Sequence, residues 1–81
     1  MRQITLAGNT AVLDLNKFFY PLHVLQQAST RFEKIAKVSV QEEGGRAIVS
    51  LEPKEKGSVE ETALEFCNFA LALKRELGEH A

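Results

Sequence analysis

The chain has 81 residues, 44% of them hydrophobic, which suits one small packed domain and argues against a disordered chain. Ten basic and eleven acidic residues give a formal charge of −1, so no strong positive field exists to gather nucleic acid or anionic lipid. A single cysteine rules out an internal disulfide, and no apolar segment resembles a signal peptide or a membrane span. The sequence therefore predicts a soluble, cytoplasmic, single-domain protein over residues 1–81, with an ordered core over 4–77 and a frayed tail over 78–81.

The first predicted element is a β-hairpin over residues 4–15, with Gly8 and Asn9 as its turn. Glycine at the first central position tolerates the positive φ that a tight primed turn requires. This turn places Leu6 opposite Ala11 and gathers the apolar residues on one face of the ribbon. Turn chemistry and hydrophobic pattern thus select the same register.

The first predicted helix runs from about Pro21 to Ala36. Proline suits the first helical position because its missing N–H would have no partner there. Apolar residues recur at helical spacing and place one stripe toward a core. The members of this stripe are Leu22, Leu25, Ala28, Ser29, Phe32, Ile35 and Ala36.

A second hairpin is predicted over residues 38–51, where Gly44 and Gly45 can serve a type I′ turn, which needs a positive φ twice. This register pairs Val40 with Val49 and sends the strongest β-formers to one face.

The second predicted helix begins after Gly57, where Ser58 and Glu61 fit a capping box, and it ends near Gly78. Its predicted core stripe comprises Val59, Ala63, Phe66, Ala70, Leu73 and Leu77. Two repeats of hairpin and helix predict an α+β two-layer sandwich in ββαββα order, with a four-stranded antiparallel sheet and both helices on one face. The alternative is that the first hairpin pairs elsewhere, for instance with another subunit, and the order of the strands is left open.

The second helix is apolar over more of its circumference than a two-layer fold needs. Leu64 and Leu71 project roughly 150° away from Phe66, with Cys67 between the two stripes. Isolated surface leucines are common, so the alternative is that a small domain simply exposes one or two leucines that bind no partner. The functional interpretation is that Leu64, Cys67 and Leu71 form a contact face, for a partner protein or for a second copy of the chain.

The histidines and the cysteine of this chain do not have the spacing that a catalytic or metal site requires. His23 and His80 lack a second ligand at helical spacing. Cys67 sits mid-helix among apolar residues, where a small buried hydrophobe is the usual role of a cysteine. The sequence therefore predicts no enzyme, no metal site and no cofactor. A basic strip beside the first helix leaves open a weak nucleic-acid binder, although no stacking aromatics accompany it. Its members are Lys17, Arg31, Lys34 and Lys37.

The chain resembles the small D-component family of the His-Xaa-Ser peptide maturation systems. The resemblance lies in the segment 20–32, which leads through Tyr, Leu and Ala to Arg-Phe, and in a strand over 37–40. It continues in a strand ending over 51–54, and in a closing helix with Phe-x-Asn at 66–68 and Arg-Glu at 75–76.

This resemblance implies an accessory of radical enzymes that modify a repeat-bearing peptide, with a binding or chaperone-like role and no catalytic residues. The sequence thus predicts a non-enzymatic interaction module for a peptide or an enzyme partner, with Leu64, Cys67 and Leu71 as its contact face. The alternatives are a plain homodimer and a weak nucleic-acid binder.

Overall fold

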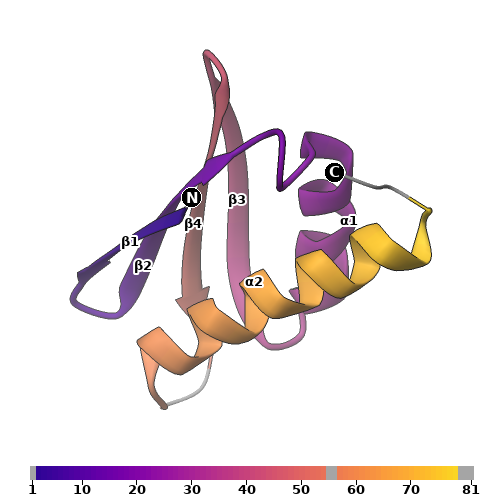
Figure 1. The fold of residues 1–81 in the computed structure, drawn as a ribbon. Helices are drawn as coiled ribbons and strands as arrows, with labels where there is room; N and C mark the ends of the chain where they lie inside the picture. Colours follow the sequence, from indigo (N-terminus) through magenta and orange to yellow (C-terminus); the bar gives the residue numbers. More distant parts are fainter. Residues whose placement is uncertain (1, 55–56, 79–81) are drawn as a thin grey trace.

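The computed structural model describes residues 2–54 and 57–78 and confirms the predicted α+β fold in ββαββα order (Figure 1). Of the predicted frayed tail, residues 79–81 lie outside the described residues. The elements are β1 (Arg2–Ala7), β2 (Thr10–Asn16), α1 (Leu22–Phe32), β3 (Ala36–Glu43), β4 (Arg46–Pro53) and α2 (Val59–Glu76).

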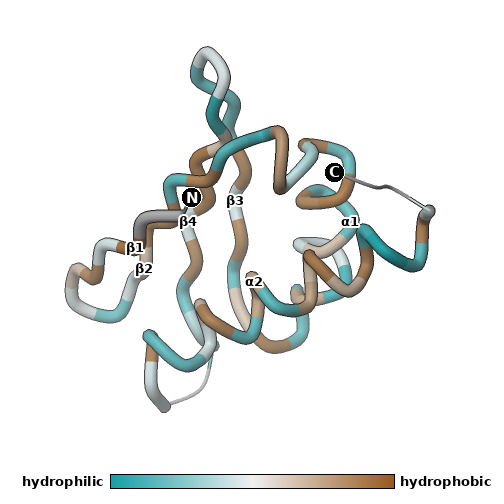
Figure 2. The backbone as a smooth tube through the Cα atoms, viewed as in Figure 1, coloured by the Kyte–Doolittle hydropathy of each residue, from teal (hydrophilic) through white to brown (hydrophobic). Residues whose placement is uncertain are grey.

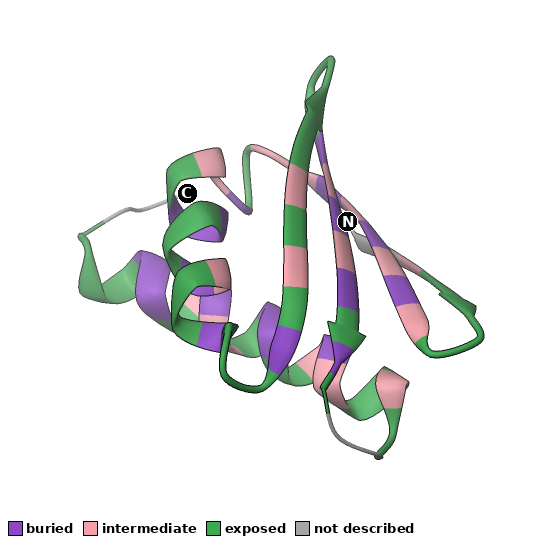
Figure 3. Ribbon diagram, turned by 180° about the vertical axis from the view of Figure 1, so that it is seen from behind, coloured by how far each residue is buried: buried purple, intermediate pink, exposed green. Residues whose placement is uncertain are grey.

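The four strands form one antiparallel sheet in the order β1-β2-β4-β3, so the two hairpins meet through their second strands. Three residue pairs across β2 and β4 have no exposed surface, which makes this junction the centre of the core. In Figure 3 the buried residues recur along β2 and β4, whereas β3 is mostly exposed or intermediate. The central pairs are Ala11 with Leu51, Leu13 with Val49, and Leu15 with Ala47.

Both hairpin registers match the prediction, with Leu6 opposite Ala11 and Val40 opposite Val49. The first turn has the expected positive φ of 61° at Gly8. The predicted type I′ turn at Gly44 and Gly45 is wrong, because only Gly44 has a positive φ, of 60°. One glycine in the left-handed region is therefore enough to close this hairpin.

Helix α1 is shorter than predicted at both ends. Pro21 is extended, with ψ at 143°, and caps the helix through its carbonyl, which accepts hydrogen bonds from the N–H groups of Val24 and Leu25. The helix ends at Phe32, whereas the prediction continued it to Ala36. The Ile35 carbonyl instead accepts a hydrogen bond from the Lys54 N–H, and β3 begins at the next residue. Long-range strand pairing therefore overrides the helical periodicity.

Helix α2 begins as predicted. The Ser58 hydroxyl accepts a hydrogen bond of 3.1 Å from the Glu61 N–H, and Glu60 adds a second acidic residue in the first turn. At the other end Gly78 has a φ of 77° and stops the helix. The predicted core position of Leu77 is wrong, because this residue is 44% exposed at the C-cap.

Each helix packs mainly on strands of the hairpin that it does not follow. Helix α1 lies on β3, whereas α2 lies on β2, β4 and β1, and the two helices contact each other. Between them the rings of Phe32 and Phe66 meet edge to face at 5.3 Å, a favourable aromatic geometry. Figure 2 shows the hydropathy alternating along β3 beside the helices, with a hydrophilic tip on the second hairpin.

The turn geometry predicts different effects of alanine at two neighbouring glycines. Gly44→Ala should destabilise the chain by about 1–2 kcal/mol, because an L-residue is strained at positive φ. Gly45→Ala is the matched control: an added Cβ meets nothing within 4 Å at either site, but Gly45 has no positive φ. Urea unfolding followed by circular dichroism measures both values. Equal stability of the two variants would contradict the turn described above.

Candidate interaction surface

The buried arc of α2 fixes which of its sides remains available. Phe66 and Ala70 face the sheet and the core, and Phe69 lies on the side toward α1, where its ring is 5.5 Å from that of Phe32. Leu64 and Leu71 lie roughly 150° from Phe69 around the helix, on the side away from α1. Both are half-buried.

The three residues of the predicted contact face do not share one environment. Cys67 has no exposed surface and belongs to the core cluster, so it offers no area to a partner. Leu71 packs partly against the same cluster, and Leu64 is half-buried one turn before the cysteine. The surface that remains accessible consists of Leu64 and Leu71, which we call the Leu64/Leu71 flank. The sequence analysis gave Cys67 two roles, a small buried hydrophobe and a member of the contact face, and its full burial agrees with the first.

An edge strand contacts the same helix. Strand β1 pairs with β2 and with no other described strand, and it contacts α2. Its residue Leu6 points to the helical face of the sheet but is 49% exposed. Ile4, on the same face, packs partly against the core. Apolar side chains of β1 and α2 thus border solvent on neighbouring elements.

Two phenylalanines of the aromatic cluster before α1 are exposed, although such a cluster is usually a helix staple and core plug. Of the three aromatics before α1, only Tyr20 is buried, while Phe18 is 66% exposed and Phe19 is half-exposed. Their rings meet edge to face at 5.1 Å. The Lys74 ammonium donates to the Phe19 carbonyl over 3.4 Å and so ties this loop to the last turn of α2.

A hollow of about 440 Å³ lies between the two helices. Phe32, Phe69 and Ile35 supply its apolar wall, and charged Arg31 and Glu65 line the remainder. The sequence analysis placed Ile35 in the core, but it is 51% exposed because the helix ends before it.

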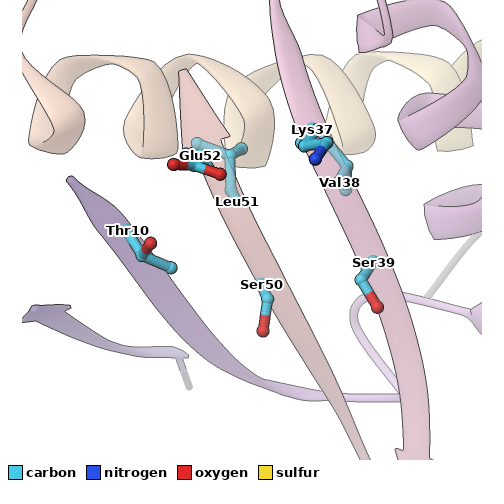
Figure 4. Close-up of a pocket in the computed structure, with 7 residues that line it drawn as sticks. All are labelled: Thr10, Lys37, Val38, Ser39, Ser50, Leu51 and Glu52. Carbon is cyan, nitrogen blue, oxygen red and sulfur yellow. The ribbon is translucent and has the colours of Figure 1, made fainter. Parts of the chain in front are cut away.

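The open face of the sheet carries a second hollow of about 340 Å³, shown in Figure 4. Hydroxyl groups of Thr10, Ser39 and Ser50 line it from three different strands. Lys37 and Glu52, which are register partners on β3 and β4, add one charge of each sign. Of the residues that line this hollow, none is a histidine, the commonest base that activates a serine or threonine hydroxyl.

The residues that could bind a metal are dispersed. Within residues 2–54 and 57–78 no three His, Cys, Asp or Glu side chains come together as a metal site. His23 is exposed on α1, and His80 lies outside the described residues. Of the helices in these two ranges, none combines the length and the hydropathy that a transmembrane span requires.

The structure does not bring the predicted basic strip together. Lys17 forms an ion pair with Glu42 of the second hairpin, and Lys37 lies in β3 on the open face of the sheet. Arg31 and Lys34 remain exposed near the end of α1. No continuous basic track therefore runs along one side of this helix.

Comparisons with known proteins identified no relative of this chain. Neither a scan against protein-family models nor searches of the curated proteins and of the solved structures found a match to this chain.

The burial of Cys67 predicts slow reaction with thiol reagents. The native chain should be labelled about a thousandfold more slowly than the chain in denaturant, because the reagent must wait for an opening of the core. Absorbance of the released chromophore of a disulfide reagent measures both rates. A Cys67→Ala/Ala72→Cys variant, with its thiol on the exposed side of α2, should react rapidly without denaturant. Fast labelling of native Cys67 would contradict its burial and show that its thiol is accessible to solvent.

Proposed function

We propose that this chain is a non-enzymatic interaction module that binds a protein or peptide partner through the Leu64/Leu71 flank of α2. The observation that supports this proposal is that two half-buried leucines lie on α2, and that this helix contacts the edge strand β1, where Leu6 is exposed. A lone surface leucine needs no explanation, but apolar side chains on two contacting elements offer a patch that a partner can cover.

Two other apolar regions support the proposal less well, because their side chains already have partners within the chain. In the hollow between the helices, Phe32 packs against both Phe66 and Phe69. Phe18 and Phe19 pack against each other, and Lys74 holds the Phe19 carbonyl.

The class of partner rests on the resemblance to the D components of His-Xaa-Ser peptide maturation systems. On this basis the module is an accessory of a radical-enzyme system that modifies a repeat-bearing peptide, and it works in the cytoplasm. A chain with one cysteine needs no oxidising compartment, which agrees with this location. A nucleic-acid partner has less support, because Lys17 is ion-paired and the remaining basic residues are spread over α1 and β3.

A synthetic peptide carrying His-Xaa-Ser repeats provides the test. We expect the wild-type chain to bind this labelled peptide, and we expect Leu64→Glu/Leu71→Glu to weaken the binding at least tenfold. The reason is that each charge would have to be buried against the partner, at a cost above the roughly 1.4 kcal/mol that corresponds to tenfold. Fluorescence anisotropy measures the dissociation constant.

The matched control adds the same two charges at exposed positions outside the flank. Gln27→Glu/Ala72→Glu changes the net charge equally and should bind the peptide as the wild type does. Circular dichroism confirms that both variants are folded. If the folded Leu64→Glu/Leu71→Glu variant keeps full affinity, the flank is not the contact surface. If the wild type does not bind the peptide, the repeat-bearing peptide is not the partner.

A further inference from the structure

Helix α2 carries a strip of four side chains with a regular order of charge and hydropathy. Glu60, Leu64, Leu71 and Arg75 fall within about 60° of the helix circumference at 100° per residue. The two leucines are half-buried, and the two charged residues are exposed. Along the helix the strip is acidic, apolar, apolar and basic. We call it the Glu60–Arg75 strip.

The strip is complementary to itself when it is reversed. Leu64 follows Glu60 by four residues, and Leu71 precedes Arg75 by the same distance. A two-fold axis through the middle of the strip therefore places Leu64 opposite Leu71 of a second copy, and Glu60 opposite Arg75 of that copy. Within one chain Glu60 and Arg75 are about 22 Å apart along the helix, too far to pair with each other.

From this self-complementarity we infer that the Leu64/Leu71 flank is the seam of a homodimer in which two α2 helices pack antiparallel along the Glu60–Arg75 strip. The inference rests on the proposed function, because it names a second copy of the chain as a protein partner of the same flank, for which that copy and the peptide would compete. Antiparallel packing also opposes the two helix dipoles, which places the acidic first turn of each helix beside the basic last turn of the other. An isologous contact of this kind closes after two subunits.

The edges of the sheet differ in a way that agrees with a covered β1. Strand β3, the other edge, carries Lys37, Glu42 and Glu43, charges of the kind that protect an exposed edge from pairing. Residues 4–7 of β1 carry no charge, and Leu6 is exposed beside α2. A stable interface needs more area than one helix flank offers, and β1, which contacts α2, is the neighbouring strand that can extend it.

Charge reversal tests the seam. Glu60→Arg makes both charges of the strip basic, and Arg75→Glu makes both acidic. In a dimer of either variant alone, residues 60 and 75 of opposite copies carry the same charge at both contacts. The dimer dissociation constant should therefore rise about tenfold at low salt. An equimolar mixture of the two variants should restore the dimer, since every contact then joins opposite charges. The double variant Glu60→Arg/Arg75→Glu should also dimerise as the wild type does. Sedimentation velocity over a concentration series measures all four samples.

Glu65→Arg is the control, because it makes the same charge change on the side of α2 that faces α1 and should leave dimerisation unchanged. A wild-type chain that stays monomeric over the series overturns the homodimer. So do single variants that associate as tightly as the wild type, or a mixture that gains nothing. If the chain is monomeric while the peptide still binds through Leu64 and Leu71, the homodimer fails and the proposed function stands. If neither association depends on these leucines, both fail.

Discussion

The antiparallel pairing of β2 with β4 is the contact on which the rest of the structure depends. Each hairpin alone is a two-stranded ribbon, which is marginally stable in water at best. Joined through their second strands, they present one continuous apolar face of fully buried residues. That face provides the site on which both helices pack. The burial of Cys67 in α2 and the position of the edge strand β1 follow from this junction.

The pairing also explains why polar and apolar surfaces are unequal on the two sides of the sheet. The face toward the helices holds the core, while the opposite face carries hydroxyl and charged side chains over the hollow near Ser39 and Ser50. The two edge strands differ as well, because β3 carries charged side chains and residues 4–7 of β1 carry none. The candidate contact surface lies on the side of the molecule where this protection is missing.

Local signals in the sequence predicted the hairpins well, because turn residues and alternation each specify the register and agree with one another. They predicted the start of α2 for the same reason, since Ser58 is a local cap. They failed where a distant residue decides. Nothing near Ile35 shows that its carbonyl will accept a hydrogen bond from Lys54, so the helical stripe was continued too far. The helical wheel placed Cys67 between two apolar stripes, and which of them it joins depends on how α2 lies across the sheet.

Because α1 rests on β3 and α2 rests on β2, neither hairpin-and-helix half of the chain encloses an interior of its own. A fragment ending after α1 would leave both its ribbon and its helix without their apolar partners. The two halves therefore gain their stability in one cooperative event, although the repeated pattern of the sequence suggests two separable modules.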